Sequence, residues 1–227
     1  MRNERALIAC TVALLVAIGW LFLLRGMPMG TMAPPLTALI AMWWLMMLAM
    51  MLPSATPALL LYARVRHVRA GDAPIGPTWM FLAGYVAVWL GFSMAAALAQ
   101  SAVTDSSMIL QNNTAQSALL ILAGLYQLTP LKSACLRQCR SPAQFMSRHW
   151  RPGRDGAIRL GIIHGAYCVG CCWMLMALLF VGGVMNLIWV IALTVLVASE
   201  KLLPGGLFIQ RISGAALILW GLWKAVA

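Results

Sequence analysis

The residues best suited to chemistry lie in one short stretch, His164 to Trp173, which holds three of the six cysteines and one of the three histidines. An α-helix turns by about 100° per residue, so four side chains share one face within about 100° of arc: His164, Cys168, Cys171 and Cys172. Thiolates and imidazoles are soft ligands suited to copper(I) or zinc(II). The alternative is that these cysteines only pack as small buried hydrophobes.

A second pair of cysteines, Cys135 and Cys139, is separated by four residues. This spacing places both thiols on one face of a helical turn. The pair is suited to hold a soft metal ion or to act as a redox-active dithiol. Two inert thiols at the membrane interface are the plain alternative.

A stripe of methionines runs through the apolar segment 36–62 at helical spacing: Met42, Met46, Met47, Met50 and Met51. Thioethers bind copper(I) weakly and exchange it easily, as a path for a moving metal ion requires. Methionine is also a flexible filler of apolar gaps, so packing alone is the competing interpretation.

The composition of the chain excludes a soluble globular protein. Of its 227 residues, 63% are hydrophobic and 9% are charged, and the mean hydropathy is +0.88, whereas soluble domains carry about 25% charged residues. The net charge of +11 does not indicate a nucleic-acid partner, because the sequence has no folded basic domain. We interpret the excess of Lys and Arg as a topological signal in a membrane protein whose main partner is the lipid bilayer.

We predict an all-α fold, a polytopic transmembrane helical bundle with about seven spans and with six as the alternative. A span needs about 20 apolar residues, so 227 residues leave room only for a single integral membrane domain, 1–227. The predicted spans are about 6–24, 36–62, 78–103, 116–131, 160–181, 185–203 and 207–223.

The basic loops predict the orientation of this bundle. Loops 64–77, 132–159 and 200–211 are rich in Lys and Arg, which marks them as cytoplasmic. Seven spans then place the N-terminus in the cytoplasm and the C-terminus outside. Four predicted ligands fall at the cytoplasmic side: Cys135, Cys139, His164 and Cys168. Structural disulfides are not expected there, because the cytoplasm is reducing.

Three polar residues near the ends of predicted spans are candidates to support the metal ligands or to couple proton movement: Tyr126, Gln127 and Glu200. An ionisable group such as Glu200 near the membrane edge is a functional hypothesis by default. Its neighbour Lys201 offers a simpler alternative, an interfacial pair of opposite charges.

Several of these segments together resemble a bacterial family described as predicted metal-binding integral membrane proteins of unknown function. The resemblance covers most of the chain from about residue 40 to 206. It rests on residues 46–54, 83–85 with Trp89, 124–132 with Cys135, 139–142, 164–173 and 200–201. It implies metal binding within a membrane, and we place the protein in the bacterial inner (cytoplasmic) membrane.

The favoured function is to bind, and to transport or transfer, a soft transition metal, with copper(I) preferred and zinc as the alternative. A membrane thiol–disulfide oxidoreductase is a second hypothesis. The third is a non-catalytic subunit, since small-residue faces allow a homo-oligomer or a complex with another membrane protein. The sequence shows no nucleotide-binding loop, hydrolase motif or haem-attachment motif, which favours a role other than enzymatic catalysis.

Overall fold

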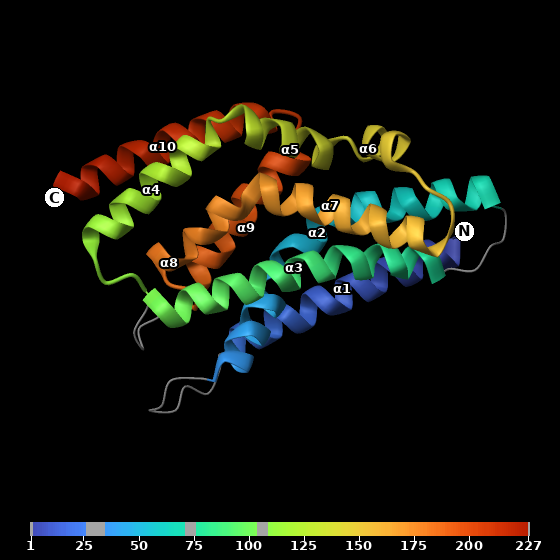
Figure 1. Cartoon of the computed structure of the whole chain (residues 1–227), viewed down its shortest axis with the longest axis horizontal. Coiled ribbons are helices and arrows are strands. Elements are labelled where there is room, and N and C mark those ends of the chain that lie inside the picture. Colours follow the sequence, from blue (N-terminus) through green and yellow to red (C-terminus); the bar gives the residue numbers. More distant parts are fainter. Residues whose placement is uncertain (1, 26–34, 71–75, 104–108, 227) are drawn as a thin grey trace.

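The computed structural model describes residues 2–25, 35–70, 76–103 and 109–226, and within these ranges all regular secondary structure is helical (Figure 1). The predicted all-α fold is therefore confirmed. The helices are α1 (Arg2–Arg25), α2 (Leu36–Ala70), α3 (Gly76–Val103), α4 (Asn113–Gln127), α5 (Pro130–Arg140), α6 (Pro142–His149), α7 (Gly153–Ala177), α8 (Leu179–Gly182), α9 (Leu187–Leu202) and α10 (Gly206–Val226).

Five of the described helical segments are long and apolar enough to cross a membrane: Glu4–Arg25, Leu36–Arg69, Gly76–Ala102, Gly153–Gly182 and Gly206–Val226. Helices α4 and α5 make a sixth if the pair, bent by 63°, counts as one span. Helix α9, in the place of the predicted span 185–203, has 16 residues. At about 1.5 Å of rise per residue it covers about 24 Å, less than a hydrocarbon core of about 30 Å.

Glycines allow the helices of this bundle to approach closely. A side chain at Gly161 of α7 would begin 2.0 Å from the carbonyl oxygen of Phe81 in α3, and one at Gly84 would meet Ile158 at 2.4 Å. Helices α4 and α10 use the same device, since a Cβ at Gly124 would lie 2.7 Å from the carbonyl oxygen of Gly214. In a membrane there is no hydrophobic driving force between helices, so helices associate largely through van der Waals contact. Small residues permit this contact because they let the backbones approach closely.

Helix α2 continues through its two prolines, Pro53 and Pro57. Near these prolines, side-chain hydroxyl groups donate hydrogen bonds to backbone oxygens. Ser54 Oγ donates to Met51 O at 2.9 Å, and Thr56 Oγ1 donates to Leu52 O at 2.9 Å. Polar side chains of this kind allow proline in a membrane helix. The result is an unbroken helix that carries the methionine stripe along the core.

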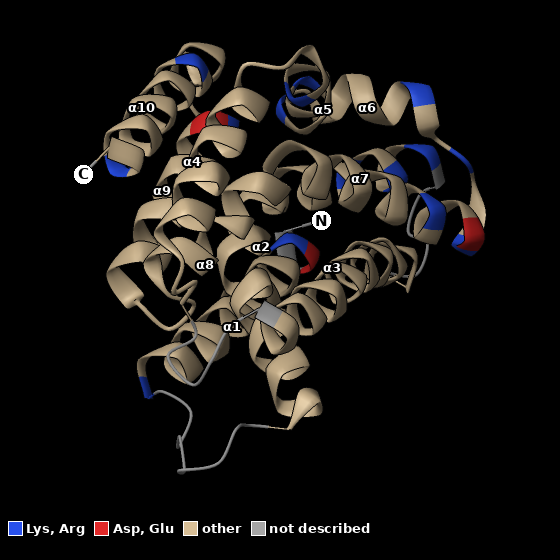
Figure 2. Cartoon of the chain, turned by 60° about the vertical axis from the view of Figure 1, so that its left-hand side comes forward, with Lys and Arg blue, Asp and Glu red and all other residues tan. Residues whose placement is uncertain are grey.

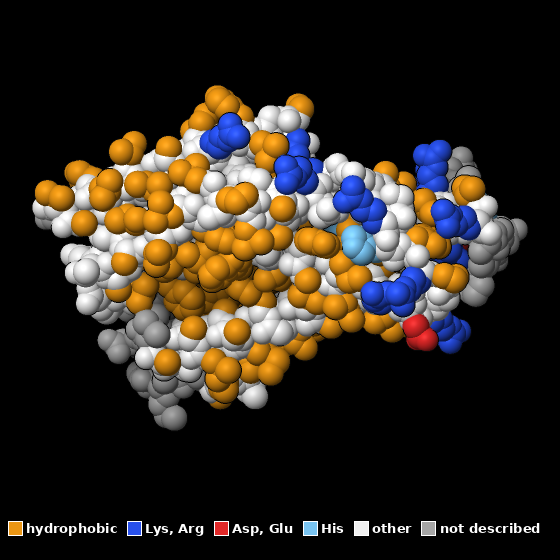
Figure 3. Space-filling model, turned by 45° about the horizontal axis from the view of Figure 1, so that its top comes forward, with side chains coloured by type: hydrophobic (Ala, Val, Ile, Leu, Met, Phe, Trp, Pro, Cys, Tyr) orange, Lys and Arg blue, Asp and Glu red, His pale blue; other side chains and the backbone are white. Residues whose placement is uncertain are grey.

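The surface divides into an apolar part and a basic end. In Figure 3 hydrophobic side chains cover the left and centre of the view, and most Lys and Arg side chains lie towards the right. Figure 2 shows basic residues gathered around α6 and the start of α7. The N-terminus lies at the basic end and the C-terminus at the opposite end (Figure 1). This arrangement supports a multi-pass membrane protein, and the assignment of the basic end to the cytoplasm stays a prediction.

Candidate metal centre

Sulfur atoms from three helices converge at the point where α5 packs against α7. The thiol of Cys139 in α5 interacts with the side chains of Cys168 and Cys171 in α7. Cys172, one residue further along α7, has its Sγ atom 3.9 Å from the thioether sulfur of Met51 in α2. We call this set the sulfur cluster: Met51, Cys139, Cys168, Cys171 and Cys172.

Four members of the sulfur cluster are buried, and Cys139 is partly exposed. Cys168, Cys171 and Cys172 are at most 2% exposed, and Met51 is fully buried. The thiols of Cys171 and Cys172 donate to the backbone oxygen of Cys168 at 3.1 and 3.0 Å. All four cysteines of the cluster are free, so their sulfur atoms carry the lone pairs that a soft metal ion requires.

A buried lysine faces this cluster from α9. The Nζ atom of Lys201 lies 3.0 Å from Cys168 Sγ, 3.7 Å from Met51 Sδ and 3.4 Å from Ser54 Oγ. Lys201 is 6% exposed, and a buried ammonium group needs a compensating negative charge. Among these three contacts only the sulfur of Cys168 can carry one, so we assign Cys168 as a thiolate. Tyr85 Oη also lies 3.1 Å from this sulfur.

A glycine sets the distance between α5 and α7. A Cβ atom at Gly170 would lie 3.0 Å from the Sγ atom of Cys135, closer than most side chains tolerate. The backbone oxygen of Gly170 also accepts a hydrogen bond of 2.5 Å from Tyr126 Oη in α4. The close approach brings both cysteines of α5 to the face of α7 that carries the sulfur cluster.

The donor set fits a soft ion bound by few ligands. Within residues 2–25, 35–70, 76–103 and 109–226, no three or more His, Cys, Asp or Glu side chains are placed to hold a metal ion. A preformed cage of the kind that structural zinc sites use is therefore not among the described residues. Thiolates and thioethers are nevertheless the ligands that select copper(I), and copper(I) accepts as few as two of them.

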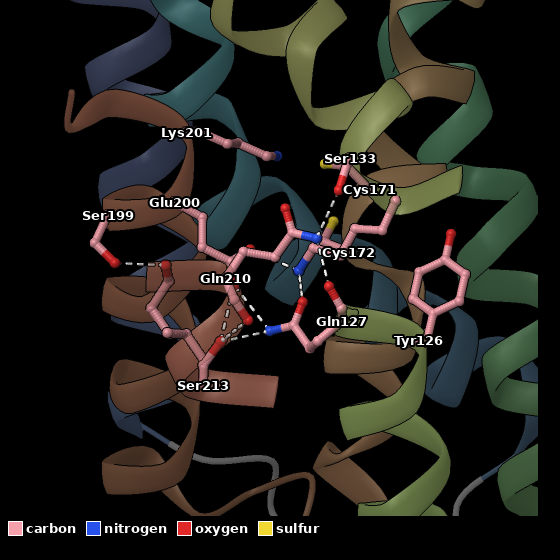
Figure 4. A network of polar contacts seen from close by, with 12 residues as sticks. Tyr126, Gln127, Ser133, Cys171, Cys172, Ser199, Glu200, Lys201, Gln210 and Ser213 are labelled. Carbon is pink, nitrogen blue, oxygen red and sulfur yellow. Dashed lines mark hydrogen bonds and ion pairs between the residues drawn. The ribbon is translucent and has the colours of Figure 1, made fainter. Parts of the chain in front are cut away.

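A second group of buried polar side chains lies where α4, α5, α9 and α10 meet (Figure 4). Glu200 accepts from Lys132 Nζ at 2.7 Å through one carboxylate oxygen. Through the other it accepts from Gln127 Nε2 at 2.8 Å and from Ser213 Oγ at 3.3 Å. Lys132 also donates to Gln127 Oε1. We call this set the polar network: Gln127, Lys132, Glu200, Gln210 and Ser213.

The polar network ties four helices together. Gln210 of α10 donates to the backbone oxygen of Gln127 and, at 3.1 Å, to Ser133 Oγ in α5. Arg140, at the end of α5, donates to the backbone oxygens of Glu200 at 2.5 Å and Pro204 at 3.0 Å, where α9 ends. The oxygen of Glu200 belongs to the last turn of α9, where backbone oxygens lack partners within the helix, and Pro204 lies just beyond the end of that helix.

His164 lies apart from the sulfur atoms, among aromatic rings. Its ring centroid is 5.1 Å from that of Phe145, 5.8 Å from Tyr85 and 5.9 Å from Phe81. The side chain is 2% exposed, and its Nδ1 atom has no hydrogen-bond partner in the described part of the chain. His164 therefore sits one helical turn from Cys168, with one nitrogen unpaired, and its role as a ligand stays a prediction.

The predicted methionine path lies in the core of the bundle. Four of its members are at most 2% exposed: Met42, Met46, Met47 and Met50. Only Met51 of the stripe reaches the cluster, through Cys172 and Lys201. The stripe thus leads along α2 towards the cluster, and the metal path along it stays a prediction.

The structure adds three residues that the sequence did not single out for the site. Lys201, expected at most to pair with its neighbour Glu200, faces Cys168 instead, and the partner of Glu200 is Lys132. Tyr85 contacts the sulfur of Cys168 from α3. All three belong to segments of the family resemblance or directly adjoin its motifs, but only tertiary contacts assign them to the site.

Comparison with known proteins gives one result. A family model described as PpoB2, copper chaperone, matches residues 40–224. Comparisons with curated proteins and with solved structures give no significant match. The matched range contains every member of the sulfur cluster and of the polar network, and its description supports the predicted preference for copper. With most of its length matched in this way, the chain belongs to the PpoB2 copper chaperone family.

Proposed function

We propose that this membrane-embedded chaperone binds copper(I) at the sulfur cluster and passes it to a partner by exchange between thiolates. The observation that carries the proposal is that Cys168 Sγ and Met51 Sδ lie 3.0 and 3.7 Å from the same Lys201 Nζ atom, while Cys172 Sγ lies 3.9 Å from Met51 Sδ. Sulfur ligands of this kind select copper(I) over harder ions. Burial of Met51 and Cys168 limits the access of water to an ion held there.

The cluster offers more sulfur atoms than copper(I) needs. Cys168 and Cys139 supply two thiolates, and Met51 supplies a weaker thioether ligand. Each thiol that becomes a ligand gives up its proton as its bond to copper forms, so binding releases protons without any change in oxidation state. The remaining thiols, Cys171 and Cys172, can replace a ligand one at a time, which is how a chaperone releases a tightly held ion.

The other predicted ligands have subsidiary places in this proposal. Cys135 lies beside Gly170 on the α5 side of the cluster, where it can receive copper from Cys139. His164 offers its unpaired nitrogen one turn away. On the predicted topology this end of the cluster faces the cytoplasm. Tyr126, Gln127 and Glu200 support the helices that carry the ligands.

The test is copper binding by protein purified in detergent under reducing, anaerobic conditions. Copper per chain is measured by mass spectrometry, and affinity for copper(I) is measured by competition with a chromophoric chelator. We expect about one copper per chain in the wild type and a loss of at least about tenfold in affinity for Cys168→Ser, because the variant loses a thiolate ligand. Cys10→Ser is the matched control, since Cys10 is an exposed cysteine on α1.

Two results would contradict the proposal. One is equal copper affinity in Cys168→Ser, Cys10→Ser and wild type. The other is the absence of bound copper in the wild type after copper(I) has been supplied. In the second case, titration of the thiols for a reversible disulfide between Cys139 and Cys168 or Cys171 tests the oxidoreductase alternative.

A further inference from the structure

The sulfur cluster contains a positive charge that metal binding must accommodate. Lys201 reaches from α9 into the space beside Cys168 and Met51, at 3.0 and 3.7 Å from their sulfur atoms. Its neighbour Glu200 cannot compensate it, because both carboxylate oxygens of Glu200 are engaged by the polar network. Whatever ion binds at these sulfurs therefore shares a buried site with an ammonium group.

At such a site the summed charge of the thiolates, the metal ion and the ammonium group differs between a monovalent and a divalent metal ion. Two thiolates, one copper(I) ion and one ammonium group sum to zero. The same ligands with zinc(II) or cadmium(II) leave one uncompensated positive charge, which is costly in a buried environment. A third thiolate would restore the balance, but no three Cys, His, Asp or Glu side chains among the described residues are placed to hold one ion.

We propose that Lys201 makes the sulfur cluster selective for a monovalent soft metal ion over divalent ones. This inference rests on the proposed function and adds a determinant of specificity to it. Lys201 acts through its charge rather than as a ligand, since an ammonium group has no lone pair to offer a metal ion. Ser54 Oγ, 3.4 Å from Lys201 Nζ, gives the ammonium a hydrogen-bond partner when the metal ion engages Cys168.

The experiment compares ions that share softness but differ in charge. Affinities for Cu(I), Ag(I), Cd(II) and Zn(II) are measured by competition with chelators in wild type, Lys201→Met and Lys201→Arg. In Lys201→Met we expect the affinities for Cd(II) and Zn(II) to rise relative to Cu(I) by about tenfold or more, because one buried positive charge is removed. The ratio of Ag(I) to Cu(I) affinity should stay unchanged, and Lys201→Arg should behave like the wild type.

Each outcome bears on the proposal. Unchanged ratios of divalent to monovalent affinity in Lys201→Met overturn it, even if all affinities fall together. If Lys201→Met does not fold, judged by circular dichroism and gel filtration, Lys201→Gln provides the same loss of charge with a polar side chain. A wild-type protein that binds Cd(II) as tightly as Ag(I) overturns the proposal without any variant. A wild type that binds copper in no assay instead refutes the proposed function itself.

Discussion

The sulfur cluster and the polar network are neighbouring buried sites that treat charge differently. In the polar network the negative group is the carboxylate of Glu200, and Lys132, Gln127 and Ser213 all donate to it. In the sulfur cluster the cation Lys201 faces the thiolate of Cys168 and the neutral thioether of Met51. In the first arrangement both oxygens of the Glu200 carboxylate are engaged without a ligand, whereas the second leaves soft electron pairs that a metal ion can use.

In two pairs of adjacent residues, one side chain joins the polar network and the other contacts α7. Glu200 belongs to the polar network and Lys201 to the sulfur cluster, although they are neighbours on α9. On α4, Gln127 joins the polar network, while Tyr126 Oη donates to the backbone oxygen of Gly170 in α7. Consecutive residues on a helix point about 100° apart, so one helix can serve both sites. The polar network links α5 to α9. These are the helices that bring Cys139 and Lys201 to α7.

The largest effect should come from breaking the ion pair of the polar network. Lys132→Met leaves the buried carboxylate of Glu200 without its cation, and we expect a loss of about 3–5 kcal/mol in the free energy of unfolding. Thermal unfolding in detergent, followed by circular dichroism, measures it. Arg137→Met, an exposed position on the same helix, is the control and should change stability little.

The ion-pair interpretation also predicts a rescue. The double variant Lys132→Met with Glu200→Gln removes both charges and should recover a large part of the lost stability, because no uncompensated charge remains buried. If Lys132→Met is no less stable than Arg137→Met, the polar network does not stabilise the helices, and the contrast with the sulfur cluster fails.

A smaller effect should come from separating the two helices that carry the sulfur cluster. Gly170→Val would place a branched side chain against Cys135, whose sulfur lies 3.0 Å from the position of the first added carbon. We expect overpacking to cost about 1–3 kcal/mol of stability and copper(I) affinity to fall, since α5 must move away from α7. Chelator competition and thermal unfolding measure the two effects.

Gly91→Val in α3 is the matched control, because nothing lies within 4 Å of a Cβ atom there. Equal copper affinity and equal stability in the two glycine variants would show that the contact between Cys135 and Gly170 does not position the cluster.

The smallest effect is expected for Tyr126→Phe, which removes the hydrogen bond from Tyr126 Oη to the backbone of Gly170. A single hydrogen bond contributes about 1 kcal/mol to stability, so the unfolding temperature should fall slightly while copper per chain stays the same. Leu125→Ala, at a half-exposed position on the same helix, controls for general weakening of α4. A loss of bound copper in Tyr126→Phe would mean that Tyr126 belongs to the metal site rather than to its support.

The all-α membrane fold and the preference for copper could be predicted from the amino-acid sequence alone. Apolar segments of about 20 residues with few charges match the length of a membrane-spanning helix, which satisfies its own backbone hydrogen bonds within the segment. The spacing of Cys168, Cys171 and Cys172 placed their side chains near one another on α7, because helical periodicity is local. The apolar pattern did not predict that the segment 185–203 would form a helix of only 16 residues.

Only the tertiary structure decided which groups meet across helices. Lys201 and Glu200 are adjacent in sequence, and opposite charges side by side favour an interpretation as a local pair. In the fold Glu200 pairs with Lys132 and Lys201 faces Cys168, 68 and 33 residues away along the chain. Such partners depend on how α5, α7 and α9 pack, and that packing is set by close contacts such as the one at Gly170, which no local pattern encodes.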